Sequence, residues 1–219
     1  MSGEWDKFFQ RHKKNAEEKN ISFEESIDAE WRDADKWFKN YILPFLPKEK
    51  CAICEIGPGS GRFSRYLVNN ATQYYLVENS EYVCDLLKNI YGNKENVRVL
   101  HNKDSSLSDI SDNSVDFIFS IGTFVHLYIE QIYGYFSEFH RVLKSGGKCV
   151  IHLQTFMSDE GYNFFVENLA KNGKYDNRSI FRFYHPEEIE KIADKIGFEI
   201  QSKVFVPKTR HFFIIVSKK

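Results

Sequence analysis

The stretch "CAICEIGPGSGRFSRYL", residues 51–67, constrains the fold more than any other part of the sequence. A short apolar run ends in an acid, and three glycines within five residues then lead into a helical pattern. Gly57, Gly59 and Gly61 allow a tight turn that brings backbone N–H groups close to a ligand. A strand that enters a helix through such a turn predicts a βαβ unit with a ligand site at the turn.

Strand and helix patterns alternate through the rest of the chain. The strand patterns fall at 73–78, 96–101, 114–122 and 148–156, and the helix patterns at 61–70, 80–92 and 128–147. This alternation predicts a mainly parallel sheet with helices on both faces, which is a three-layer α/β sandwich. After a further helix at 186–198, the runs 199–206 and 211–217 flank "PKTR" and predict an antiparallel hairpin.

The first 48 residues differ from the rest. Residues 11–26 carry many charges of both signs and predict a solvated helix or a partly mobile arm. Apolar positions then recur at spacings of three and four and predict a helix; they are Trp31, Ala34, Phe38, Tyr41 and Phe45. We expect a helical extension or lid at 1–48, followed by one domain at 49–219 with an insertion at about 157–185.

Charge and hydropathy narrow the classes of partner. The 219 residues hold 30 Lys and Arg against 31 Asp and Glu, a net charge of −1, and no basic tract, so we expect no nucleic-acid partner. No apolar run approaches the roughly 18 residues of a membrane span, so we expect no membrane partner. The N-terminus carries acids and has no apolar core, so it does not resemble a secretion signal and predicts a cytoplasmic protein.

Cys51 and Cys54 form a CxxC pair, which raises the question of a metal site. A structural zinc site usually needs a second such pair, and the other two cysteines, Cys84 and Cys149, stand alone. The pair also lies inside an apolar run, where free cysteines behave as small buried hydrophobes. We predict no metal.

The spacing around the glycine turn weighs against two familiar ligands. A dinucleotide turn needs a third small residue at the position that Arg62 occupies, and a phosphate loop needs a lysine after the turn, which is missing. Glu55, two residues before the first glycine, repels a pyrophosphate but suits an ammonium group. Glu78 ends the next strand and can accept hydrogen bonds from both hydroxyls of a ribose. Asp104 follows the third strand and can accept from an exocyclic amine, so the set fits S-adenosylmethionine.

Several motifs in order resemble one family. "EIGPGSGRF", "VEN", "NKDSS", "DNSVDFIFS", "FVHL" and "FHRVLKSGG" resemble class I S-adenosylmethionine-dependent methyltransferases of the small-molecule type, and "YHPEEIEKIADKIGFEI" is similar to them too. The resemblance covers about Cys51 to Lys219 and implies a Rossmann-like, seven-stranded, mainly parallel sheet with an antiparallel last strand. Ser145 departs from the pattern, because the family usually has Pro there.

The resemblance also implies roles in binding the cofactor. Glu55, Gly57, Gly59 and Gly61 would contact the methionine part, Glu78 the ribose and Asp104 the adenine, with Asn79 and Ser105 flanking the adenine. If Glu78 is exposed at its strand end, its replacement should leave the stability of the free protein unchanged.

Acceptor residues are predicted from position. His126 follows the fourth strand at the mouth of the site and is our candidate general base, whereas His152 suits a hydrogen-bonded core position. Arg178, Arg182 and Tyr184 in the insertion suit a sugar, a phosphorylated metabolite or an anionic aromatic, with O-methylation favoured. The alternatives are a nicotinamide-dependent oxidoreductase and a catalytically inactive binding module that keeps this fold.

Overall fold

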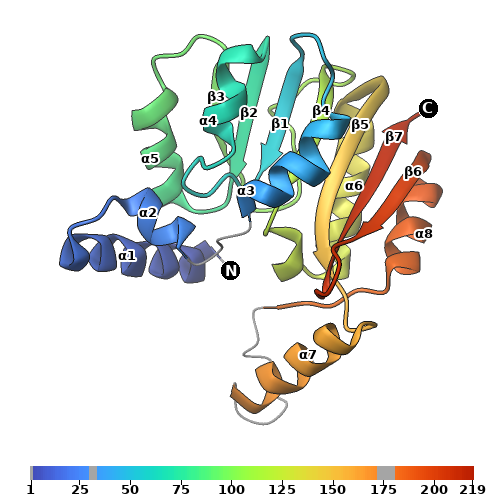
Figure 1. The fold of residues 1–219 in the computed structure, drawn as a ribbon. Helices are drawn as coiled ribbons and strands as arrows, with labels where there is room; N and C mark the ends of the chain where they lie inside the picture. The colour runs from blue at the N-terminus through green and yellow to red at the C-terminus, as the bar shows by residue number, and fades with distance from the viewer. Residues whose placement is uncertain (1, 30–33, 172–180) are drawn as a thin grey trace.

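A seven-stranded sheet forms the centre of the protein, whose computed structural model describes residues 2–29, 34–171 and 181–219 (Figure 1). The strands are β1 (Ala52–Ile56), β2 (Gln73–Glu78), β3 (Val97–His101), β4 (Val115–Ser120), β5 (Leu143–Gln154), β6 (Phe198–Phe205) and β7 (His211–Lys218). Their order is β3-β2-β1-β4-β5-β7-β6. The first five run parallel, and β7 is antiparallel to both β5 and β6, as predicted.

Helices cover both faces of this sheet and one of its edges (Figure 1). They are α1 (Ser2–Lys19), α2 (Phe23–Asp28), α3 (Ala34–Trp37), α4 (Ser64–Leu67), α5 (Glu81–Tyr91), α6 (Ile129–Val142), α7 (Asp159–Lys171) and α8 (Pro186–Ile196). Neighbouring residues of β1 face opposite sides: Cys54 belongs to the core under α6 and α8, and Ile53 to the core under α3, α4 and α5. This alternation with a period of two produces the predicted three-layer sandwich.

Three helix boundaries differ from the sequence prediction. The helix expected to end just before Gly146 and Gly147 ends at Val142, because Leu143 already pairs with Val115 across a register shift in β4 and β5. The helix expected at 61–70 is one turn, α4, followed by a 3-10 turn at Val68–Asn70. The segment after α3 winds into a π-helix (Phe38–Ile42) and a 3-10 turn that holds Pro44.

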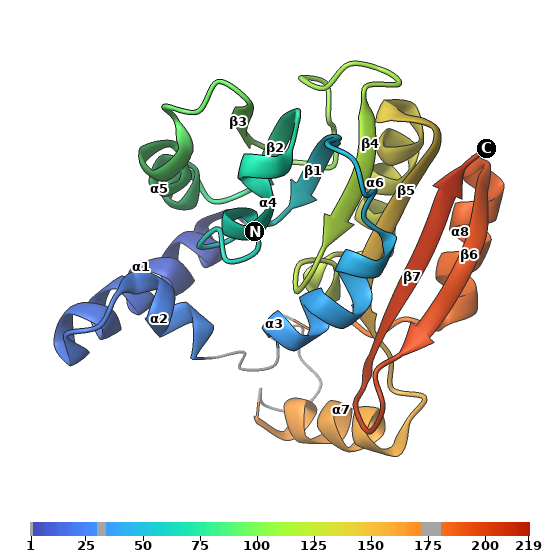
Figure 2. The same cartoon turned by 45° about the horizontal axis from the view of Figure 1, so that its top comes forward.

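Helices α1, α2 and α7 lie at the edge toward which the arrowheads of β1 and β4 point (Figures 1 and 2). Helix α1 packs against the domain rather than lying free in solvent, since Phe9 and His12 are buried and His12 Nδ1 lies 3.0 Å from the Ser26 hydroxyl. Ligands of open α/β sheets bind beyond this carboxyl edge of the strands. Within the described residues, every helix is too short or too polar to cross a membrane.

Candidate cofactor and acceptor site

The glycine turn joins β1 to α4 at the carboxyl edge. Gly57 has a φ of +70°, and a Cβ atom there would stand 1.9 Å from the Thr123 hydroxyl oxygen, so only glycine fits. Gly59 also has a positive φ, +53°, but a Cβ atom there would meet no heavy atom within 4 Å. Gly61 packs against Leu87 and Tyr91 instead. The turn is therefore closed by packing at two glycines and opens into free space at the middle one.

Glu78 lies beside that open position. Its side chain is only 6% exposed, and its carboxylate accepts hydrogen bonds from the backbone N–H groups of Asn79 (2.8 Å), Ser80 (2.9 Å) and Gly59 (3.3 Å). Burial raises the pKa of Glu78, while these three N–H groups act in the opposite direction. Glu78 is therefore not exposed at its strand end, and the expectation that its replacement leaves stability unchanged no longer applies. Its carboxylate also holds the turn together.

Glu55 is more deeply placed, with 2% of its surface exposed. One of its carboxylate oxygens accepts from the Ser64 hydroxyl at 2.6 Å and the Tyr74 hydroxyl at 2.8 Å. Burial raises the pKa of Glu55 to about 7, against the lowering effect of the two hydroxyls. Its contact with the methionine part of the cofactor stays a prediction.

Replacing Glu55 with Gln is expected to change how stability depends on pH. The ordinary pKa of 4.5 rises to about 7 on folding, so between these values the folded protein keeps a proton that the unfolded chain has lost. Stability from this group therefore falls as pH rises through that window, on the order of 3 kcal/mol in total. The free energy of unfolding of Glu55→Gln, relative to the wild type, should rise between about pH 4 and about pH 8 in urea titrations. Glu81→Gln, at an exposed position, is the control and should show the same pH dependence as the wild type. If Glu55→Gln also showed the pH dependence of the wild type, the raised pKa of Glu55 would be refuted.

The predicted adenine residues lie on the next two loops. Asp104 is exposed and accepts from the Ser106 backbone N–H at 2.7 Å. The amide nitrogen of Asn79 donates to the Asn102 carbonyl at 2.9 Å, while its buried Oδ1 has no hydrogen-bond partner among the described residues. Ser105 packs against Gly134 of α6. A cavity of about 270 Å³ is lined by this loop and includes Val77 and Asp104.

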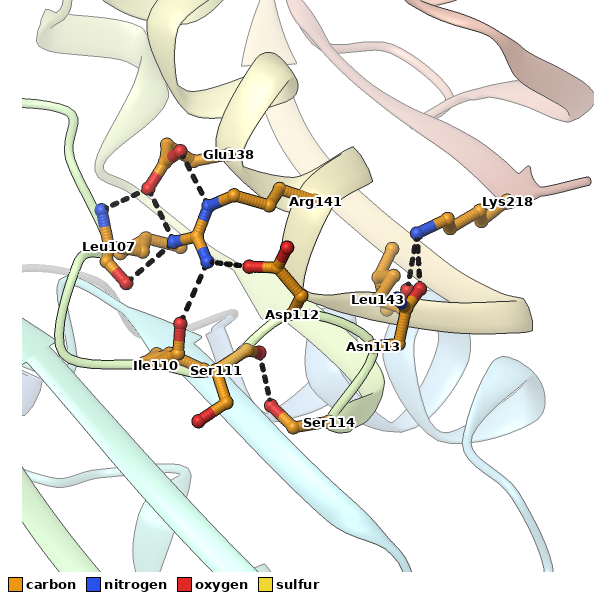
Figure 3. Close-up of polar contacts among 10 residues, drawn as sticks. All are labelled: Leu107, Ile110, Ser111, Asp112, Asn113, Ser114, Glu138, Arg141, Leu143 and Lys218. Carbon is orange, nitrogen blue, oxygen red and sulfur yellow. Dashed lines mark hydrogen bonds and ion pairs between the residues drawn. The ribbon is translucent and has the colours of Figure 1, made fainter.

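Arg141 of α6 fastens this loop to the domain (Figure 3). Its guanidinium donates to the carbonyl oxygens of Leu107 (2.8 Å) and Ile110 (2.9 Å) and pairs with Asp112. Glu138, one turn earlier, pairs with Arg141 at 2.8 Å and accepts from the Leu107 N–H at 2.6 Å. The sequence analysis missed this anchor, although Arg141 lies in the "FHRVLK" motif and Glu138 directly precedes it.

His126 is the point at which three distant segments meet. It ends the short 3-10 turn Phe124–His126 that follows β4. Its ring centroid lies 4.7 Å from that of Trp5 in α1 and 5.1 Å from that of Phe181, within the insertion. The N-terminal extension and the insertion are thereby brought to the residue predicted as general base.

The predicted acceptor residues of the insertion are placed less favourably. Arg178 lies outside the described residues. Arg182 lies over the Tyr128 ring, 4.4 Å from its centroid, and donates to its hydroxyl at 2.8 Å. Tyr184 is buried, and its hydroxyl donates to the Leu127 carbonyl, which points to a packing role. The contacts of Arg182 and Tyr184 with an acceptor stay predictions that this geometry does not favour.

His152 and His211 form a buried, hydrogen-bonded pair that the sequence did not predict. His152 Nδ1 accepts from the Gly122 backbone N–H at 3.1 Å, so its Nε2 carries the proton and donates to His211 Nδ1 at 2.9 Å. Burial lowers the pKa of both, that of His211 to about 3. The core position predicted for His152 is confirmed, whereas its partner comes from β7, far away in sequence.

Comparisons with known proteins agree with this fold. Residues 54–151 match the family described as "Methyltransferase domain". Over 123 residues, 55% of this chain, the sequence is 31% identical to phosphoethanolamine N-methyltransferase 3 of Arabidopsis thaliana, of which the match spans a quarter of the length. The fold is similar to a protein of Pyrococcus horikoshii (TM-score 0.68, 19% identity, 87% of this chain and 92% of that one). It is also similar to a Methanosarcina mazei S-adenosylmethionine-dependent methyltransferase (TM-score 0.63, 18% identity, 81% of this chain and 96% of that one).

The family match over residues 54–151, the fold and the glycine turn support a class I S-adenosylmethionine-dependent methyltransferase. The predicted family, fold and cofactor are thereby confirmed. The residues present fit this cofactor: the space at Gly59 admits a ligand against the backbone, and the unpartnered Asn79 Oδ1 can accept from an N–H donor such as the adenine amine.

Proposed function

We propose that the protein transfers a methyl group from S-adenosylmethionine to a hydroxyl oxygen of a small molecule. The observation that carries the proposal is the position of His126 after β4, between Trp5 and Phe181. The cofactor supplies an activated methyl group on its sulfonium. The chain has to align the acceptor, exclude water and take the proton of the hydroxyl, and His126 is placed for the last task.

A second candidate is transfer to an amine nitrogen. The relative with 31% identity is named as an N-methyltransferase of phosphoethanolamine, and the aromatic rings of Trp5 and Phe181 beside His126 also suit a cationic group. A protonated amine must lose its proton before its nitrogen can attack, so His126 would serve this reaction too. A panel that pairs each hydroxyl compound with the corresponding amine, assayed with labelled S-adenosylmethionine, distinguishes the two. Label transferred to neither would defeat the small-molecule proposal.

We propose further that residues 1–48 close the acceptor site as a lid. Trp5 of α1 lies against His126, and the Asp6 carboxylate accepts from the Ser80 hydroxyl at the start of α5. Such a cover excludes water from methyl transfer. The predicted absence of a nucleic-acid or membrane partner and the cytoplasmic location stay predictions of the sequence.

The lid predicts a selective effect of Trp5→Ala. Removal of the ring should lower turnover by about tenfold or more, because a misplaced acceptor and admitted water both slow the transfer, while cofactor affinity changes little. Lys14→Ala, at an exposed position of the same helix, is the matched control and should behave as the wild type. Full turnover by Trp5→Ala on the true acceptor would show that α1 does not act as a lid over the acceptor site.

A further inference from the structure

Arg210 is a half-buried arginine next to the start of β7, at the carboxyl edge of the parallel strands. Its Nε donates to the Gln154 side-chain carbonyl at 2.9 Å, and its Cζ lies 3.6 Å from the ring centroid of Phe164 in α7. In the described part of the chain, no carboxylate pairs with Arg210, and its two terminal nitrogens donate no hydrogen bond. A guanidinium is therefore oriented by one hydrogen bond and one aromatic ring, with most of its donors unused.

The surroundings of Arg210 do not neutralise its charge. Burial lowers the pKa of Arg210 to about 10, with no acid acting in the opposite direction. The same charge helps to keep the neighbouring histidines neutral, since it lowers the pKa values of His211 and His152. Buried charges in proteins are normally paired, because an unpaired one costs several kcal/mol. A negative partner that arrives with a ligand would remove this cost.

The position of Arg210 connects it with the reacting centre. The Phe181 ring centroid lies 6.0 Å from Arg210 Cζ and 5.1 Å from the His126 ring centroid. The Phe181 ring thus lies near both the Arg210 guanidinium and the proposed base. Arg182, by contrast, donates to Tyr128 and lies over its ring.

We propose that Arg210, oriented by Gln154 and Phe164, binds an anionic group of the methyl acceptor, a carboxylate or a phosphate, while the nucleophile of that acceptor lies at His126. The proposal rests on the proposed function, because it places the acceptor beside His126. The two terminal nitrogens of a guanidinium can hold two oxygens of such a group at once. The acceptor class would then be small anionic metabolites rather than neutral sugars or simple aromatics.

The test uses inorganic phosphate and acetate as probes, titrated by calorimetry into full-length protein saturated with S-adenosylhomocysteine. The wild type should bind at least one of the two, and the preferred probe distinguishes a phosphate from a carboxylate acceptor. Arg210→Met should weaken that binding by about tenfold or more, and Arg210→Lys should restore part of it, because it keeps the charge without the fork. Lys208→Asn removes an exposed charge from the same hairpin and should leave binding unchanged.

Thermal unfolding of the free protein gives a second, independent readout. Arg210→Met removes an unpaired charge, so its melting temperature should equal or exceed that of the wild type, whereas a purely structural arginine would lower it. Absence of binding of both probes to the wild type, or equal binding by wild type and Arg210→Met, would overturn the proposal. If Arg210→Met fails to fold, that result too contradicts it, and the Arg210→Lys titration still measures the role of the fork. These titrations require no turnover, so they remain informative if methyl transfer itself is not found.

Discussion

His126→Asn is expected to lower kcat by about 10²- to 10⁴-fold, the range over which general-base catalysis contributes. Asparagine keeps a polar side chain of similar reach between Trp5 and Phe181, but it cannot take up a proton at neutral pH. Cofactor affinity should stay within about twofold of the wild type, because the proposal gives His126 a role toward the acceptor and none in binding the cofactor. Single-turnover assays with a saturating acceptor separate this chemical step from binding.

The matched control is His140→Asn, since His140 lies in α6 beside Phe198 and outside the contacts that surround His126. It should retain wild-type turnover. An unchanged kcat in His126→Asn would assign His126 to packing between the extension and the insertion, and the proton would then have to leave by another route.

Glu78→Ala is expected to weaken S-adenosylmethionine binding roughly 10- to 150-fold, equivalent to about 1.5–3 kcal/mol, because charge-assisted hydrogen bonds to the ribose hydroxyls are lost. The free protein should also lose about 1–3 kcal/mol of stability. The backbone N–H groups of Asn79, Ser80 and Gly59 would lose the carboxylate that accepts from them.

Glu78→Gln separates the two effects, because it keeps one oxygen for the backbone donors and removes the charge. Glu78→Gln should therefore be more stable than Glu78→Ala and closer in stability to the wild type. Its affinity for the cofactor should still fall. Unchanged affinity together with a large loss of stability in Glu78→Ala would make the residue structural only. Calorimetry and urea unfolding on the same preparations provide both values.

The sequence predicted those parts of the fold that depend on neighbouring residues in the chain, namely the strands and the glycine turn. Short apolar runs identified the strands. The glycine turn identified the carboxyl edge, because only glycine tolerates the backbone of Gly57 beside Thr123. The strand predicted from residue 148 begins earlier, at Leu143, and α6 ends correspondingly early, since the pairing of Leu143 with Val115 decides both boundaries. Such pairing involves residues far apart in the chain, and it overrides the glycines that predicted a later helix end.

The same limit applies to the site. Acids at successive strand ends could be found from spacing, but the burial of Glu78 depends on how the turn folds back over it. Arg210 has no distinguishing neighbours in the sequence, and its significance appears only when α7, β5 and Phe181 meet around it. Arg182 was the more conspicuous arginine in the sequence, and in the structure it donates a hydrogen bond to the hydroxyl of Tyr128.

Isothermal titration of the purified protein with S-adenosylmethionine, S-adenosylhomocysteine and NAD tests the central claim most directly. The account predicts that the first two bind with a Kd in the micromolar range or tighter, and that NAD binding is negligible. The acids Glu55 and Glu78 at the turn suit a sulfonium amino acid and a ribose, and Arg62 stands where a dinucleotide turn needs a small residue. Tighter binding of NAD than of S-adenosylhomocysteine would contradict the account.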